Sequence, residues 1–158
     1  MKTRAPRALV VLAVAAIAAL TVATAASAAA SPKFMPQFTD ATFSSPNLIV
    51  NFKMSGLGSF ATVDITATAT ATRVDACVNN GQNIPADPKK TTTVATASGS
   101  GTFPVQNGQV TGSVTVTPPG TSLNCPNGQT ATLLSISYSN VVISGAGVSF
   151  SIPGTFGP

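Results

Sequence analysis

The chain has 158 residues and a formal net charge of +4, from eight Lys and Arg against four Asp, and it contains no histidine. Without histidine there can be no Ser-His-Asp triad, no histidine-ligated zinc or copper site and none of the usual imidazole general bases. Because the two cysteines are expected to pair and the four aspartates are scattered, we predict that the protein is not an enzyme and binds no metal or cofactor.

The N-terminal segment has the pattern of a secretory signal peptide. Three basic residues precede an uncharged apolar run over residues 8–20, and an Ala-Ser-Ala cleavage site follows at residues 26–28. The alternative is an uncleaved membrane anchor over residues 8–30, a length sufficient to span a bilayer. The large apolar side chains stop at the end of the first run, which favours cleavage of residues 1–28 and an extracellular product.

Cleavage changes the charge of the protein that remains. Removing residues 1–28 leaves 130 residues, in which five Lys and Arg and four Asp give a net charge of +1. This small charge offers no basic stripe for nucleic acid or for an anionic membrane. We expect a secreted monomer with no nucleic-acid partner and no membrane association. A chain of this size forms one domain, which we place at residues 38–158, after a flexible lead over residues 29–37.

Two segments alternate between apolar and polar residues, which is the period of a half-buried strand. Residues 48–54 place Leu, Val, Phe and Met on one face, and Gly56-Leu57-Gly58 ends the segment. Residues 61–78 alternate Ala, Val or Ile with Thr or Asp, but the apolar phase changes after Arg73. This change predicts a β-bulge or bend near Thr72-Arg73, or two strands joined there.

The remaining chain reads as short strands separated by turns. Turn signals stand at Asn107-Gly108, Asn127-Gly128 and Ser144 to Gly147, and a polar loop follows residue 78. In the strand predicted over residues 132–142, we expect Leu134, Ile136 and Tyr138 on one face. About seven or eight strands with no helical period predict an all-β, antiparallel, immunoglobulin-like β-sandwich. The absence of Trp excludes an antibody-type core, and with a single Tyr it argues against a carbohydrate-binding module with an aromatic platform.

The two cysteines predict one disulfide, since a secreted chain with an even number of cysteines pairs them. Cys77 and Cys125 each stand just before an Asn-Gly-Gln turn, so we expect both turns at the same end of the sandwich. The disulfide either fixes a loop surface for a partner or only stabilises a small domain. The candidate binding residues in these loops are Asn79, Asn80, Gln82, Asn127 and Gln129.

Several short motifs occur in a particular order along the chain after the signal peptide. They are Gly56-Leu57-Gly58, Cys77 to Gly81, Pro118-Pro119-Gly120, Cys125 to Gln129 and the ending Pro153 to Phe156. In this order the chain resembles a group of small secreted actinobacterial proteins that are uncharacterised. The resemblance implies a secreted, immunoglobulin-like sandwich domain and no catalytic residue.

The leading hypothesis is a non-enzymatic module that binds a protein or cell-surface partner through its disulfide-stapled loops. A second hypothesis is a small-molecule carrier, because the chain resembles the Ala/Thr/Gly/Val-rich chromoprotein apoproteins of actinobacteria. A third is a protease inhibitor that presents Ile84-Pro85 or residues 123–125. An apolar cleft would favour the carrier, a polar loop end would favour the partner-binding module, and an exposed loop beside the disulfide would favour the inhibitor.

Overall fold

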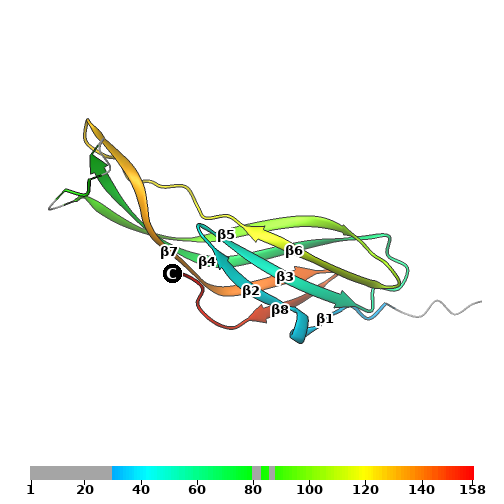
Figure 1. Cartoon of the computed structure of the whole chain (residues 1–158). Coiled ribbons are helices and arrows are strands. Elements are labelled where there is room, and N and C mark those ends of the chain that lie inside the picture. The colour runs from blue at the N-terminus through cyan, green and yellow to red at the C-terminus, as the bar shows by residue number, and fades with distance from the viewer. Residues whose placement is uncertain (1–29, 80–82, 86–87) are drawn as a thin grey trace, which may run out of the picture.

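The computed structural model describes residues 30–79, 83–85 and 88–158, so the predicted signal peptide and its cleavage site lie outside the described residues. The described chain is all-β and forms two antiparallel sheets (Figure 1). Its strands and one 3-10 helix are β1 (Lys33–Phe34), η1 (Pro36–Phe38), β2 (Asp40–Ser44), β3 (Asn47–Ser55), β4 (Thr62–Asn79), β5 (Lys90–Pro104), β6 (Gln109–Val116), β7 (Gln129–Gly145) and β8 (Val148–Ile152).

The first sheet is built around β3, which pairs with β1 and β2 along one edge and with β6 along the other. The short helix η1 separates β1 from β2, so together they form one interrupted edge strand. The sequence predicts a flexible lead over residues 29–37, whereas the structure places Lys33–Phe34 in this sheet. Phe34 is buried, and its ring packs edge-on against Phe52 with 6.4 Å between the ring centroids.

The second sheet has the strand order β5-β4-β7-β8. β4 pairs with β5 without a break from Thr62 opposite Pro104 to Ala76 opposite Lys90. The irregularity predicted near Thr72-Arg73 belongs instead to the pairing with β7, where the register shifts twice and each extra residue lies in β7. One shift disrupts the predicted alternation of β7.

The alternation predicted for Leu134, Ile136 and Tyr138 is therefore wrong at its first residue. Ile136 and Tyr138 are buried, whereas Leu134 is exposed. Leu133 pairs with Asp75 and Ser135 pairs with Val74, so Leu134 is the extra residue of a β-bulge. The extra residue of a bulge has no partner on the neighbouring strand, and the bulge changes the direction in which its side chain points.

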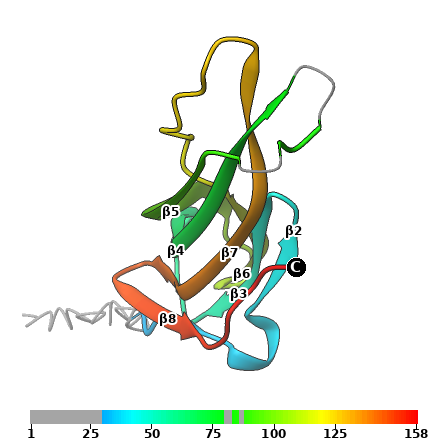
Figure 2. The same ribbon diagram turned by 90° about the vertical axis from the view of Figure 1, so that its left-hand side faces the viewer.

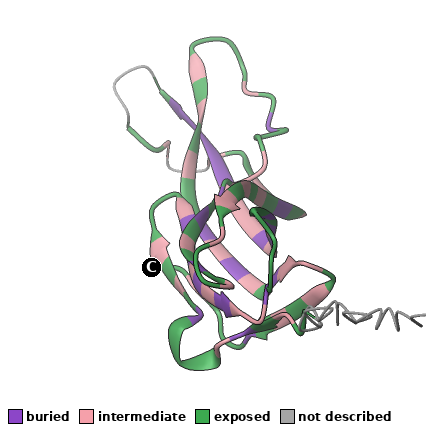
Figure 3. Ribbon diagram, turned by 90° about the vertical axis from the view of Figure 1, so that its right-hand side faces the viewer, coloured by how far each residue is buried: buried purple, intermediate pink, exposed green. Residues whose placement is uncertain are grey.

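The core lies between the two sheets, where buried residues alternate along the strands (Figure 3). The predicted alternation of β3 is confirmed, because Leu48, Val50, Phe52 and Met54 are all buried. Tyr138 lies in this core, and its hydroxyl donates a hydrogen bond of 2.7 Å to the carbonyl oxygen of Pro46. This bond satisfies the only polar atom of a buried ring.

The chain crosses from the second sheet to the first at the predicted Asn107-Gly108 turn. Both residues have positive φ angles, 51° and 68°, as a two-residue type I′ turn requires. The backbones of Gln106 and Gln109 exchange two hydrogen bonds of 2.8 and 2.9 Å across the turn. Beyond them each strand joins a different sheet, since β5 pairs with β4 and β6 pairs with β3, and the chain is bridged again between Ser98 and Thr117.

We expect Gly99→Ala to destabilise the fold by roughly 1–3 kcal/mol or more, because overpacking displaces neighbouring groups. A Cβ atom on Gly99 would lie 2.0 Å from the carbonyl oxygen of Thr115, where β5 passes close to β6. Urea denaturation of the two proteins measures the effect. Gly120→Ala is the control, since a Cβ atom there meets nothing within 4 Å. Equal stability of the two variants would contradict close contact between these strands.

Candidate functional site: the disulfide-stapled arm

Three strands of the second sheet continue beyond the end of the first sheet. The pairing of β3 with β6 ends at Leu48 opposite Val116, whereas β4 and β7 stay paired as far as Asn79 opposite Gln129. Figures 1 and 2 show these long strands projecting from the sandwich. We call this projection the arm, comprising residues 72–79 of β4, 90–95 of β5 and 129–137 of β7, with the connecting segment 117–128.

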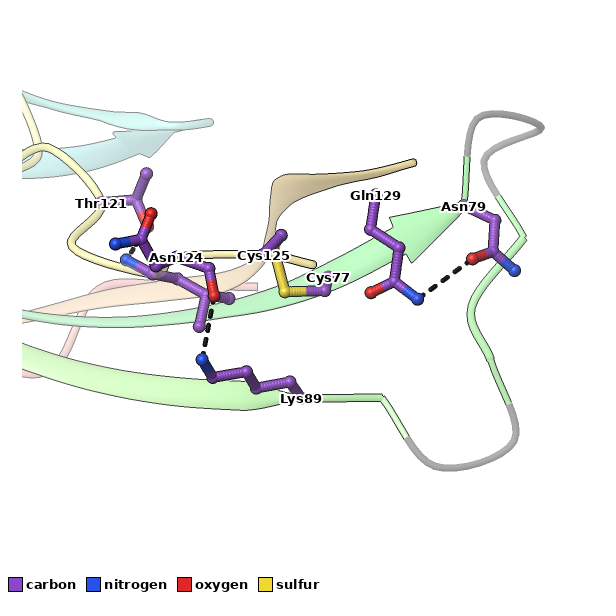
Figure 4. Close-up of a disulfide and its surroundings, with 8 residues drawn as sticks. Cys77, Asn79, Lys89, Thr121, Asn124, Cys125 and Gln129 are labelled. Atoms are coloured by element: carbon purple, nitrogen blue, oxygen red, sulfur yellow. Dashed lines mark hydrogen bonds between the residues drawn. A yellow bond between two sulfur atoms is a disulfide. The ribbon is translucent and has the colours of Figure 1, made fainter. Parts of the chain in front are cut away.

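The predicted disulfide between Cys77 and Cys125 is confirmed, with an S–S distance of 2.09 Å. It joins β4 to the connecting segment (Figure 4), and Cys77 is fully buried. The bond closes a loop with a sequence separation of 48 residues. It therefore holds the connecting segment against β4 close to the tip of the arm.

The structure brings Asn79 and Gln129 together at the tip of the arm. They are cross-strand partners, and the side-chain amide of Gln129 donates a 3.2 Å hydrogen bond to Oδ1 of Asn79 (Figure 4). Asn127 is exposed in the adjoining turn, which is closed by a backbone bond from Gln129 to Pro126. The other two candidates, Asn80 and Gln82, lie outside the described residues.

Two polar contacts that sequence reasoning missed also fix the connecting segment. Nη1 of Arg73 donates a 2.8 Å hydrogen bond to the carbonyl oxygen of Pro119. Nζ of Lys89 donates a 2.9 Å bond to the carbonyl oxygen of Asn124 (Figure 4). The side chain of Leu123 is buried between these anchor points along the chain. The segment is thus held by hydrogen bonds, an apolar anchor and a disulfide.

The apolar phase change after Arg73 marks the start of the arm. Alternation puts Arg73, Asp75 and Cys77 on the face of β4 that carries the buried Ala71, so the strand itself has not slipped. The first sheet has ended at this point, and the connecting segment contacts this face through Pro119 and Cys125. On this face Arg73 bonds to a backbone carbonyl oxygen of the segment and to Asp75, and Cys77 bonds to Cys125.

Arg73 and Asp75 form an ion pair inside the arm. The Nε atom of Arg73 lies 2.7 Å from Oδ2 of Asp75, and the two side chains are 15% and 1% exposed. The hydrogen bond from Arg73 lowers the pKa of the Asp75 carboxyl, and burial acts in the opposite direction. The same hydrogen bond raises the pKa of the Arg73 guanidinium. Both groups are therefore held in their charged forms.

Comparison with known proteins gives no relative. No family model, no curated protein and no solved structure matches the chain. In the part of the chain that the structure describes, no group of three acidic, histidine or cysteine side chains is placed to hold a metal ion. Within residues 30–79, 83–85 and 88–158, no helix is long and apolar enough to cross a membrane.

Proposed function

We propose that this protein is a secreted, non-enzymatic, immunoglobulin-like module that binds a protein or cell-surface partner through the tip of its arm. The strand order supports the immunoglobulin-like assignment. If β1 and β2 count as one first strand, the second strand (β3) pairs with the fifth (β6) in one sheet. The third (β4), sixth (β7) and seventh (β8) strands lie together in the other sheet. This is the pattern of immunoglobulin sandwiches, except that β5 joins the sheet of β4.

Two features support secretion. The N-terminal sequence has the basic, apolar and small-residue regions of a signal peptide. The chain also has a disulfide and no free cysteine among the described residues, as is usual for proteins of oxidising compartments.

The arm is the observation that carries the proposal. A turn with an exposed Asn127 stands at the end of long paired strands, and the Cys77–Cys125 bond fixes the segment that leads into it. Binding residues are commonly found on loops that a rigid scaffold holds in place. A polar turn that is already ordered also loses little conformational entropy on binding.

We expect a photo-crosslinking residue at position 127 to capture one discrete partner. The labelled protein would be irradiated with the producing cells and their culture medium, and the adducts would be resolved by electrophoresis and mass spectrometry. An excess of unlabelled protein should compete the adduct away, since a specific site is saturable.

The matched control carries the same crosslinker at Ser149, which is exposed on β8, away from the arm (Figure 2). The crosslinker at position 149 should give no adduct that an excess of unlabelled protein competes away. Equal capture from both positions, or no competed adduct from position 127, would contradict binding through the tip.

One observation favours the protease-inhibitor alternative. Ile84 is 54% exposed in the connection that follows Cys77, as a side chain presented to a protease pocket must be. The other candidate segment does not fit, because Leu123 is buried. Inhibition of elastase or subtilisin that is lost in Ile84→Asp and retained in Phe60→Asp would favour this alternative.

The carrier hypothesis has less support. The hollows on the described surface have volumes of about 320 to 450 Å³, and their walls carry many polar side chains and glycines. A ligand pocket is usually a concave, mostly apolar cavity that buries most of its ligand.

A further inference from the structure

An aromatic ring stands exposed on the outer face of the first sheet. Phe38 ends η1 and is 52% exposed. Its backbone N–H and the buried Thr39 hydroxyl each donate a 3.0 Å hydrogen bond to the carbonyl oxygen of Met35, which fixes the turn. The ammonium group of Lys53 lies 5.2 Å from the centroid of the ring. Phe38 is therefore an ordered surface ring, set beside a polar part of the sheet.

Hydrogen-bonding side chains continue from this ring along the sheet. On β3, Asn51 and Lys53 alternate with the buried Val50, Phe52 and Met54, so they face solvent. Across the strand pair, Asn51 lies opposite Ser113 and Lys53 lies opposite Thr111. Nδ2 of Asn51 donates a 3.0 Å bond to Oδ1 of Asp40 on the other side.

Two adjoining hollows follow these side chains. One, of about 450 Å³, is lined by Gln37, Phe38, Asp40, Asn51, Phe52, Thr111, Gly112 and Ser113. The other, of about 400 Å³, is lined by Lys53, Pro104, Gln106, Asn107, Gln109, Val110 and Thr111. Thr111 belongs to both, so the two hollows adjoin, and we call them together the sheet groove.

The chemistry of the sheet groove matches a sugar chain. The face of an aromatic ring carries partial negative charge and attracts the polarised C–H groups of a sugar ring. An amide offers a donor and an acceptor in one plane and a carboxylate offers two acceptors, which suits neighbouring hydroxyl groups. One cation and one anion, Lys53 and Asp40, line the groove, so no net charge selects an ionic ligand. Among the residues that line the groove, Phe38 is the large apolar side chain that is exposed. The buried core of a protein–protein interface is usually more apolar than this surface.

We propose that the sheet groove binds a neutral oligosaccharide, with Phe38 stacking on one sugar ring and Asn51, Asp40 and the glutamine side chains holding hydroxyl groups. This site goes beyond the proposed function and does not depend on it. η1 lies on the sandwich, well away from the tip of the arm (Figures 1 and 2).

The test is an NMR titration of the mature protein with maltotetraose, cellotetraose and chitotetraose. At least one of them should shift the backbone amides of Asn51, Lys53 and Thr111 in a saturable way. Phe38→Ala should weaken that binding about tenfold, the effect of losing one aromatic contact. Phe60→Ala is the matched control, because Phe60 is an equally exposed ring (48%) in the loop between β3 and β4.

Three outcomes would overturn the proposal. The first is the absence of saturable shifts with all three sugars at millimolar concentration. The second is a set of shifts centred on Asn127 and the arm. The third is an equal loss of affinity in Phe38→Ala and Phe60→Ala. Crosslinking from position 127 tests binding through the arm separately. A lack of binding at the sheet groove is therefore distinguishable from a lack of binding at the arm.

Discussion

Arg73→Ala is expected to reverse the direction in which pH changes the stability of the protein. In the wild type, Arg73 holds the pKa of Asp75 below its usual range. The pair therefore stabilises the fold above the unfolded-state pKa of about 3.9, and this contribution is lost as the pH falls through the lower folded-state pKa. Wild-type stability should decline on acidification.

In the variant, Oδ2 of Asp75 loses its donor while Oδ1 already has no hydrogen-bond partner and the side chain is 1% exposed, so burial becomes the largest influence on its pKa. The folded-state pKa of Asp75 then rises above the unfolded value. A raised pKa stabilises the fold below the unfolded pKa, and this contribution is lost as the pH rises through the folded pKa. The variant should therefore gain stability on acidification from neutral pH to about pH 4. At neutral pH it should be roughly 3–5 kcal/mol less stable than the wild type, because a buried charge has lost its partner.

Urea denaturation at a series of pH values measures both effects. The control is Arg73→Ala combined with Asp75→Asn, which removes the titrating group and should remove the reversed slope. A variant whose stability falls on acidification as in the wild type would show that Asp75 is solvated, and the buried ion pair would be disproved.

The strands could be predicted wherever one face meets the core. Leu48 to Met54 alternate because the second sheet covers one side of β3 along its whole length. In β4 the same reasoning detected the change at Arg73 and predicted a β-bulge, a bend or a junction of two strands there, whereas β4 is continuous and the nearby bulge lies in β7. Alternation reports which face is apolar, and it carries no information on what covers that face. The connecting segment, which replaces the first sheet there, is distant in sequence and has no periodicity of its own.

The candidate site could be predicted in part for the same reason. The repeated Cys-x-Asn-Asn-Gly-Gln and Cys-Pro-Asn-Gly-Gln motifs indicated neighbouring turns, and Asn79 does contact Gln129. The sheet groove could not be predicted, because composition counts aromatic residues but does not show which are exposed. The exposure of Phe38 depends on η1, which lies where the sequence indicated a flexible lead passing into the domain.

Replacing both Cys77 and Cys125 by Ala should lower the free energy of unfolding by about 4 kcal/mol, from the chain entropy of a loop of this length. The sequence separation is 48 residues. Typical domains have a stability of about 5–15 kcal/mol, so the loss is a large fraction of the total. Guanidinium denaturation of the variant, and of the wild type with and without reductant, measures it.

The loss should also be local. The disulfide joins β4 to the connecting segment, whereas the core strands β3 and β6 are held by their own pairing. Amide hydrogen exchange should therefore accelerate more in residues 73–78 and 121–125 than in β3, because partial opening begins where a local restraint is lost. Crosslinking of the partner from position 127 should also decrease in this variant, because the turn would no longer be held in one arrangement. A loss below about 1 kcal/mol with exchange unchanged in the arm would mean that hydrogen bonds from Arg73 and Lys89 suffice to hold the segment.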